Sequence, residues 1–568
     1  MISEVKLLNF KVIFPAAVLA AALTSCGTEI KKLDDIRRQS DESSQAVTTT
    51  VTTQAPTDEK EPEPVAVSFE EEKITPITIP YTEYTKTIEA EVGTLGGKAE
   101  VKDEREGYTG DGYVSGITAA EDWTVVFEIE DSQYYDISIT TASPLPCVNG
   151  LSVNGERMML LTSDGSDEFE TFTVKNRYFE AGKLTVNLEV IDASLDIDNI
   201  TLTASADVSK ISQTLKEPAL RNENADENAK ALYSYLCENY GKSVILGQYD
   251  TIGTTAESDM IYQVTGKYPA IRFGDLMLAT DADSILNNSE LEAAKKWYKD
   301  GGIVGYMWHW SAPGEENSYY SQDTDFNIMN AKTAEKTAEK SIEELEKMRD
   351  EGKISDECIA LIKDIDTVSE SLKVLRDEGI PVIWRPLHEA SNGTFWWGKD
   401  KDSYVWLWKV MYKRMTVYHK LTNLIWVWSA QNADWYVGDS QCDIISADVY
   451  DDNKLSGQVS VMLFLQSISR TKPVAMSECG SFPDIQSIAN EKAYWSYIGH
   501  WGANYLLTEN AELSEEFNTA DELIRMYNNN LTITRDKLPD LKGKAAEIVE
   551  QAVKSDDSSA AESKAASE

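Results

Sequence analysis

Eight short apolar runs alternate with helix-like stretches over residues 206–540, and this alternation most constrains the fold. Such runs, bounded by polar residues, are typical of buried strands, and stretches such as DENAKALYSYLCEN, LEAAKKWYKD and AEKSIEELEKMRDEG have helical composition. Eight strands that alternate with helices predict a (β/α)8 TIM barrel, an α/β fold. The runs are SVILGQYD, YPAIRFGD, GIVGYMWHW, PVIWRPLHE, NLIWVWSA, DIISADVY, PVAMSECG and YWSYIGHWG.

A different pattern occupies residues 80–205. Short segments such as TVVFEIE, YYDISITT and KLTVNLEVI alternate apolar and polar residues, and Gly, Asn and Asp separate them. This period of two predicts an all-β sandwich that precedes the barrel.

The N-terminal residues have the composition of an export signal. Residues 1–25 contain two lysines and a short apolar core, and the small residues before Cys26 resemble a bacterial lipobox, which implies a lipid on the Cys26 sulfur. The alternative is a plain secretory signal. Residues 26–79 are rich in Ser, Thr, Pro and Glu, which predicts a disordered tether, and residues 541–568 form a low-complexity tail.

Charge and cysteine usage narrow the function classes. The formal net charge of −43 argues against nucleic acid as a partner, because a phosphate backbone requires a basic surface. The six cysteines are scattered, without CxxC or zinc-ligand spacing, so neither a structural metal clip nor a disulfide framework is predicted. We expect a monomer at the cell surface.

Two glutamates follow barrel strands and are candidates for catalysis. Glu389 follows the fourth run and Glu478 ends the seventh, so both are expected at the same mouth of the barrel. Glycoside cleavage requires such a pair, one carboxyl group to protonate the leaving oxygen and one carboxylate to attack the anomeric carbon. The chain has no GxSxG motif, and Cys479 has no evident histidine partner.

Residues 206–540 resemble glycoside hydrolase family 26, which consists mostly of endo-β-1,4-mannanases. The matching motifs are WHW at 308–310, RPLHEA at 385–390, FWWG at 395–398, the YVGD…CDIISADVY stretch at 436–450, and SECG at 477–480. The resemblance implies a retaining enzyme that acts on β-mannan without a catalytic cofactor, with Glu389 as acid/base and Glu478 as nucleophile.

The resemblance also implies roles for neighbouring residues. His309 and His388 would bind the sugar at the cleavage point, Tyr450 would hydrogen-bond the nucleophile, and Asp443 would support the same loop. Stacking faces would come from Trp396, Trp397 and Trp501. For His309, Tyr450 and the tryptophans, the alternative is a purely structural role in the core.

One departure from the family pattern lies next to the acid. The family usually has Gly three residues and Trp five residues after it, whereas Asn392 and Thr394 occupy these positions here and Gly393 and Phe395 follow one place later. Either the turn is remodelled or an aromatic wall near the scissile bond is missing, which affects the preferred sugar.

The sandwich resembles a carbohydrate-binding module of family 35, on the stretches IEAEVG, GYTGDGYVSG, LSVNGE, AGKLTVNLEV and DIDNITL. Carried over, this resemblance makes Glu89, Glu91 and Asp198 ligands of a structural calcium ion. The alternative is a spacer whose acidic residues are solvated.

The sequence therefore predicts a membrane-anchored extracellular mannanase. Two alternatives stay open. One is another β-glycan hydrolase of the same family, a mixed-linkage β-glucanase or a β-1,3-xylanase, and the other is a non-catalytic glycan-capture lipoprotein.

Overall fold

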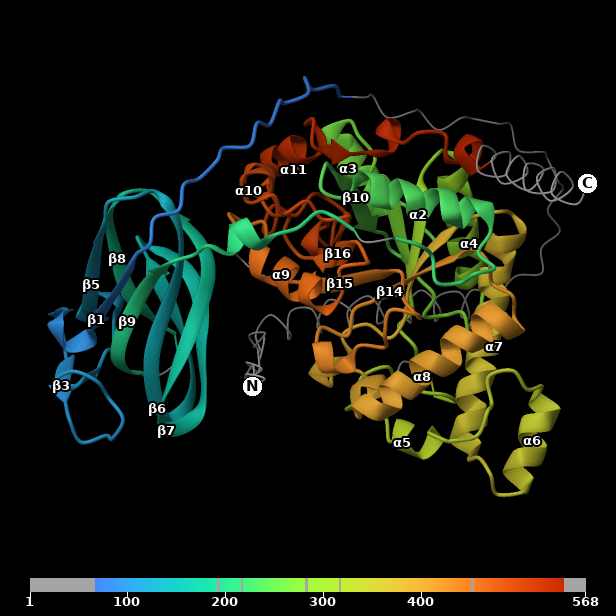
Figure 1. The fold of residues 1–568 in the computed structure, drawn as a ribbon, viewed down its shortest axis with the longest axis horizontal. Helices are drawn as coiled ribbons and strands as arrows, with labels where there is room; N and C mark the ends of the chain where they lie inside the picture. Colours follow the sequence, from blue (N-terminus) through green and yellow to red (C-terminus); the bar gives the residue numbers. More distant parts are fainter. Residues whose placement is uncertain are drawn as a thin grey trace, which may run out of the picture. The chain divides into compact units, whose positions relative to one another are not determined.

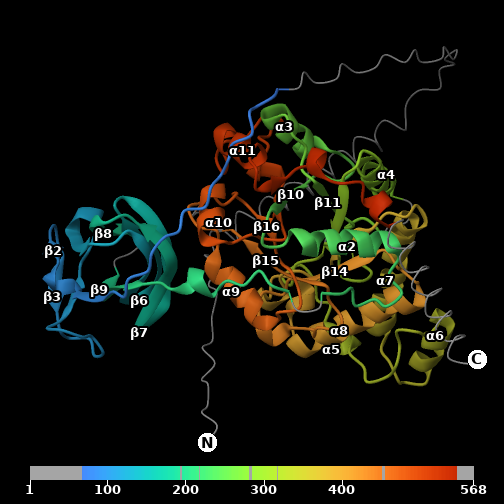
Figure 2. The same ribbon diagram turned by 45° about the horizontal axis from the view of Figure 1, so that its top comes forward.

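The protein is described by a computed structural model, and the described residues are 67–191, 195–215, 218–280, 284–315, 318–450 and 454–545. These residues form two compact units, one of residues 78–206 and one of residues 67–77 together with 207–545 (Figures 1 and 2). The predicted signal segment, Cys26, most of the tether and most of the tail lie outside the described residues.

The first unit is an antiparallel β-structure. Its strands are β1 (Thr85–Glu89), β2 (Thr94–Leu95), β3 (Glu100–Lys102), β4 (Tyr113–Ser115), β5 (Trp123–Ile129), β6 (Gln133–Val153), β7 (Glu156–Phe179), β8 (Gly182–Val190) and β9 (Asp196–Ala204). They pair in the order β2-β5-β8-β6-β9-β4-β3, and β1 joins β9 while β7 joins β6. In β5, Trp123, Val125 and Phe127 are buried, whereas Val126 and Glu128 are exposed. This alternation confirms the predicted all-β sandwich.

The second unit is a closed parallel barrel. Its strands are β10 (Val244–Tyr249), β11 (Ile271–Asp275), β12 (Ile303–Met307), β13 (Val382–Arg385), β14 (Leu424–Trp428), β15 (Ile444–Val449), β16 (Val474–Cys479) and β17 (Tyr497–His500). Each pairs in parallel with the next, and β10 pairs with both β11 and β17, which closes the ring. A short β18 (Thr532–Ile533) adds to β10. Each of the eight strands from β10 to β17 lies within one of the eight predicted runs, so the barrel is confirmed.

Helices surround this barrel (Figure 1). They are α2 (Glu227–Asn239), α3 (Ala256–Thr265), α4 (Ile285–Lys299), α5 (Ile328–Ala331), α6 (Ile342–Asp350), α7 (Asp356–Asp377), α8 (Lys401–Lys413), α9 (Val459–Ile468), α10 (Ile485–Glu491) and α11 (Ala520–Tyr527). Side chains before the first turns cap several of them, as where Ser341 and Glu344 form a capping box on α6. Among the described residues, no helix has both the length and the apolar character needed to cross a bilayer.

Residues 67–77, here called the N-terminal strap, belong to the barrel unit. The carboxylate of Glu72 pairs with Arg525 at 3.1 Å, and the side chain of Ile74 is only 3% exposed. The sequence predicted a disordered tether as far as residue 79, and this boundary is wrong for the strap. The prediction rested on the polar composition of this segment. It did not take into account that one isoleucine is buried and that acidic residues pair with basic residues of the barrel unit.

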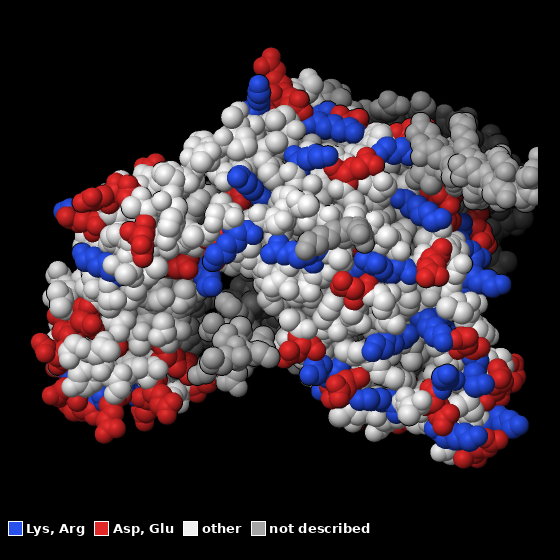
Figure 3. Space-filling model, in the orientation of Figure 1, with Lys and Arg blue, Asp and Glu red and all other residues white. Residues whose placement is uncertain are grey.

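Charged side chains lie across the surface seen in Figure 3, and the described cysteines form no disulfides. Acidic and basic side chains are interspersed on the face of the barrel unit in Figure 3, and acidic ones gather on the sandwich unit. The cysteines within the described residues are all free, namely Cys147, Cys237, Cys358, Cys442 and Cys479. No disulfide therefore constrains this part of the chain.

Candidate active site

The two predicted catalytic carboxyl groups lie at the carboxyl end of the barrel strands. Glu478 is one residue from the end of β16 and is 5% exposed, and Glu389 follows β13. Burial raises the pKa of Glu389 to about 7, and the charge of Glu478 is the second cause of this rise. The two groups therefore act on each other within one site, although they are far apart in sequence.

Both carboxyl oxygens of Glu478 accept hydrogen bonds from side chains. Arg385 at the end of β13 donates to Oε1, and the Tyr450 hydroxyl after β15 donates to Oε2 at 2.7 Å. Burial and the adjacent Glu478 charge raise the pKa of Tyr450 well above its ordinary value, so the phenol keeps its proton. A buried carboxylate oriented by an arginine and a phenol is suited to nucleophilic attack. The predicted role of Tyr450 matches this geometry.

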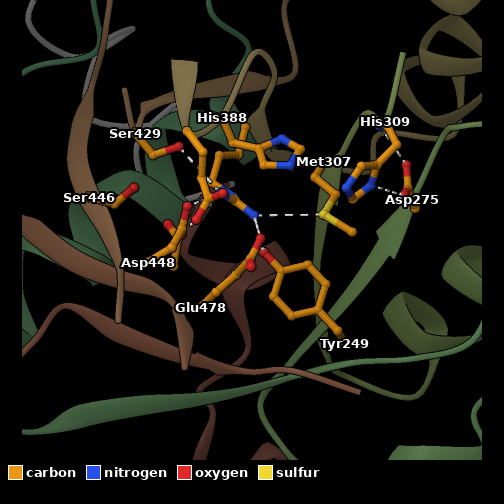
Figure 4. A network of polar contacts seen from close by, with 12 residues as sticks. Tyr249, Asp275, Met307, His309, His388, Ser429, Ser446, Asp448 and Glu478 are labelled. Carbon is orange, nitrogen blue, oxygen red and sulfur yellow. Dashed lines mark hydrogen bonds and ion pairs between the residues drawn. The ribbon is translucent and has the colours of Figure 1, made fainter. Parts of the chain in front are cut away.

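Arg385 is the centre of a buried polar network that the sequence analysis did not identify, and Figure 4 labels its partners Asp448 and Glu478. Its Nη1 lies 3.1 and 3.0 Å from the two carboxylate oxygens of Asp448, and its Nη2 donates to the hydroxyl of Tyr249 at 3.1 Å. Asp448 on β15 is the register partner of Glu478 on β16. A signal was present in the sequence, because a charged residue inside a fully buried strand requires a partner.

Glu389 sits on an unusual backbone. Its φ of 49° and ψ of 26° lie in the left-handed region, which is rare for a residue other than glycine. Its backbone N–H donates to the carbonyl of Ser429 after β14 at 3.0 Å. Strain of this kind persists where surrounding contacts enforce it and is common at active sites. With its pKa raised to about 7, the carboxyl group is suited to general acid catalysis.

The two predicted sugar-binding histidines lie side by side. His309 follows β12, and its ring centre is 4.7 Å from that of His388. Nδ1 of His309 lies 2.6 Å from Oδ2 of Asp275 (Figure 4). Burial lowers the pKa of His309, but the charge and hydrogen bond of Asp275 outweigh it, so this pKa is raised. Burial, together with the Arg385 and His309 charges, lowers the pKa of His388 well below its ordinary value.

The aromatic residues after the acid pack inward. Trp396 and Trp397 are fully buried; the indole of Trp396 donates to the carbonyl of Trp310 at 2.6 Å, and that of Trp397 donates to the carbonyl of His388 at 2.9 Å. Neither ring presents a face to a ligand, so the structural alternative describes them, and the prediction of stacking faces is wrong for both. Trp397 instead supports Phe395, whose ring stacks on it at 4.5 Å.

Trp501 differs from these two tryptophans. It follows β17 and is partly exposed. Its ring centre lies 4.9 Å from that of Tyr249 and 6.4 Å from that of His309. It thus keeps the position predicted for a stacking face beside the catalytic residues.

Asp443 does not lie near the nucleophile, and the role predicted for it is wrong. It precedes the first residue of β15, at the amino end of the barrel, whereas Glu478 is at the carboxyl end. Its carboxylate accepts the backbone N–H of Arg221 at 2.7 Å and that of Trp426 at 2.8 Å. Asp443 therefore ties the chain before α2 to β14, and Asp448 is the aspartate of this strand that belongs to the site.

The three acidic residues predicted to bind calcium lie around the turn of residues 109–111 in the sandwich unit. The hydroxyl of Thr109 donates to Glu89 at 2.7 Å, and its backbone N–H donates to Asp198 at 2.7 Å. Oε1 of Glu91 accepts the N–H of Asp111 at 2.8 Å, while Oε2 is buried without a hydrogen-bond partner. Within the described residues, no three His, Cys, Asp or Glu side chains are grouped closely enough to hold a metal ion.

A (β/α)8 barrel with a buried glutamate on the seventh strand and a second glutamate after the fourth has the arrangement of a glycoside hydrolase. Comparison with known proteins specifies the family. Residues 221–537 match glycosyl hydrolase family 26, and the chain belongs to this family. The resemblance seen in the sequence is thus confirmed.

Individual relatives cover both units. A mannan endo-1,4-beta-mannosidase of Thermothelomyces thermophilus is 32% identical over 491 residues, which are 82% of this chain and 92% of that protein. Mannan endo-1,4-beta-mannosidase B of Piromyces sp is 30% identical over 79% of this chain and 77% of its own length. The crystal structure of the Podospora anserina GH26-CBM35 beta-(1,4)-mannanase shares 32% identity at a TM-score of 0.52, over 80% of this chain and 99% of that one.

Proposed function

We propose that this glycoside hydrolase is a retaining endo-β-1,4-mannanase. One observation carries the proposal: Glu478 is a buried carboxylate fixed by Arg385 and Tyr450, and it shares its site with Glu389, whose raised pKa keeps a proton available. The relatives named as mannan endo-1,4-beta-mannosidases support β-mannan as the substrate.

The reaction proceeds by double displacement. Glu478 attacks the anomeric carbon while Glu389 donates its proton to the glycosidic oxygen, so the bond to the leaving sugar breaks and a glycosyl ester forms. The ester removes the negative charge of Glu478, which was one cause of the raised pKa of Glu389. Glu389 then accepts a proton from water as the water attacks the anomeric carbon, and the ester bond breaks.

Substrate choice is tested by comparing polymers. Reducing-sugar release from plain and galactose-branched mannan, mixed-linkage β-glucan and β-1,3-xylan is measured together with the size of the products. A mannanase releases a range of oligosaccharides from mannan at the highest rate. Faster cleavage of glucan or xylan would favour another activity of the family, and tight mannan binding without cleavage would favour the glycan-capture alternative.

The catalytic roles are tested by two variants. Glu478→Ala is expected to abolish turnover and to keep polymer binding, because it removes the nucleophile and leaves the other binding residues in place. Glu389→Ala is expected to cleave substrates whose leaving groups need no proton, with further rescue by azide. Undiminished activity of the first variant, or an equal loss for all leaving groups in the second, would contradict the assignment.

The location of the protein is a separate part of the proposal. The lipobox at Cys26, which lies outside the described residues, supports an exported lipoprotein held at the outer face of the membrane. Membrane fractionation of the wild type and of Cys26→Ala tests it. A protein that stays with the membrane after this substitution would contradict the anchor.

The sandwich is proposed to bind glycan and to be stabilised by calcium. Thr109 bonds to both Glu89 and Asp198, and a buried oxygen of Glu91 has no hydrogen-bond partner, which supports an oxygen-rich site for a hard cation. Calcium is expected to raise the unfolding temperature of the wild-type chain. The Asp198→Ala variant is expected to lose this rise. An unfolding temperature that is the same with and without a chelator would contradict the calcium site.

The chain is proposed to be monomeric, and sedimentation velocity tests this proposal.

A further inference from the structure

The turn after the catalytic acid departs from the usual family sequence, and the structure shows what this departure does. Asn392 ends a short 3-10 helix (Ala390–Asn392), and Gly393 closes the turn with a φ of 76°. Nδ2 of Asn392 donates to Oε2 of Glu389 at 3.1 Å. A glycine at position 392 has no side chain with which to make this contact.

The orientation of the Asn392 amide is fixed by a second bond. Its Oδ1 accepts the backbone N–H of Thr394 at 2.9 Å. Rotating the amide by half a turn would place two donors face to face at Thr394 and would remove the donor from Glu389. The local turn therefore keeps the NH₂ group directed at the acid.

The other oxygen of the acid also receives an amide. Nε2 of Gln431 donates to Oε1 of Glu389 at 3.1 Å and lies 3.3 Å from Oδ2 of Asp448. Gln431 follows β14 and has a φ of 62°, so its backbone, like that of Glu389, lies in the left-handed region. Both oxygens of Glu389 thus accept hydrogen bonds from side-chain amides, and such bonds favour the ionised form of a carboxyl group.

Resting on the proposed acid/base role of Glu389, we propose that Asn392 is a positioning residue that acts through Glu389. Its amide stabilises the carboxylate form, and this lowers the pH at which the acid loses its proton and helps the same group to act as base in the second step. Asn392 thereby opposes the burial and the Glu478 charge, which favour the protonated form. Asn392 is exposed, so its effect is that of one solvent-accessible hydrogen bond.

Other charged or titratable groups act on Glu389 from the surrounding strands, and all of them stay in place in the variants below. They are Glu478 on β16, Arg385 on β13, His309 after β12, Asp448 on β15 and Tyr450 after β15.

The test is the pH dependence of kcat/KM on mannan for Asn392→Ala and Asn392→Asp. Asn392→Ala removes the donor, so the pKa of Glu389 should rise. The alkaline limb of the kcat/KM profile should therefore shift to higher pH by about half a unit. Asn392→Asp keeps the oxygen that accepts the Thr394 N–H, so the turn is retained, and its added negative charge should move the limb further in the same direction. Ser391→Ala on the same turn is the matched control, because Ser391 bonds to Ala430 through its backbone N–H, which the substitution keeps.

The second step provides an independent readout. With a dinitrophenyl β-mannobioside, whose departure needs no proton, the acidic limb of kcat should also move upward in both Asn392 variants, since the base is then harder to ionise. Limbs that coincide with those of the wild type, or that move downward, would overturn the role of Asn392. If Glu389→Ala itself kept the alkaline limb, the proposed acid/base assignment would fail instead.

Discussion

The hydroxyl of Tyr450 lies 2.7 Å from Oε2 of Glu478, and it joins a residue that follows β15 to one on β16. This bond places a neutral donor against the carboxylate that is proposed to attack the substrate. Its partner on the other oxygen is a buried arginine, so the nucleophile is oriented from two sides.

Tyr450→Phe removes only the hydroxyl of this pair. A hydrogen bond to a charged group contributes about 1.5–3 kcal/mol, so kcat/KM on mannan should fall roughly 10- to 100-fold. Tyr262→Phe on α3, which removes a phenol hydroxyl from an outer helix, is the control. An unchanged kcat/KM in Tyr450→Phe would show that Arg385 alone suffices to orient Glu478.

Asp275→Asn should change how stability depends on pH. A histidine whose folded pKa is raised, as that of His309 is, adds stability that is fully present below its unfolded pKa of about 6.5 and is lost as the pH rises through the folded pKa. The substitution removes the charge that raises this pKa. The stability difference between wild type and variant should thus be largest below about pH 6.

Urea unfolding followed by tryptophan fluorescence at a series of pH values measures this difference. The stability difference between the wild type and Asp275→Asn should decrease as the pH rises. The difference that remains at high pH should come from hydrogen bonds to the neutral histidine. A difference that stays constant with pH would mean that the charge of Asp275 does not act on His309.

Asp443→Ala separates structure from catalysis. The backbone N–H groups of Trp426 and Arg221 would lose their acceptor, and each unsatisfied buried donor costs about 1–3 kcal/mol. Thermal unfolding should therefore occur at a lower temperature, while the folded enzyme keeps the kcat and pH profile of the wild type. A large loss of kcat without loss of stability would restore the original prediction that Asp443 supports the loop beside the nucleophile.

Ile74→Ala tests the contribution of the N-terminal strap to the barrel. Ile74 is 3% exposed, and truncating a buried isoleucine to alanine destabilises a protein by about 2–5 kcal/mol. Ile77→Ala, at a side chain that is 60% exposed in the same strap, should change the free energy of unfolding by about 0.5 kcal/mol or less. Equal effects of the two substitutions would show that the strap is not packed in this way.

The elements that repeat along the sequence were predictable, because each depends on local pattern. The eight apolar runs located the barrel strands, and the glutamates at the ends of the fourth and seventh runs met at one mouth because parallel strands end on the same side. The site depends on contacts between distant segments, so it was predicted only in part. Arg385 was visible in its motif, but nothing local showed that it would bridge Asp448 and Glu478.

Asp443 and Asp448 show where the sequence was insufficient. They belong to one apolar run and differ only in which end of the strand they occupy. Assigning the role to one of them requires the strand boundaries, which apolar patterning locates poorly. Trp396 and Trp397 show the same limit for burial, since a tryptophan facing a sugar and one facing the core have the same sequence signature.

The strap has a consequence for how the chain responds to proteolysis. The polypeptide leaves the barrel unit after residue 77 and returns to it at residue 207, so the sandwich is an insertion with two covalent connections. A single cut near residue 207 would therefore leave the amino-terminal fragment attached to the barrel through Glu72 and Ile74. A nicked enzyme would migrate as two bands under denaturing conditions and as one particle under native conditions.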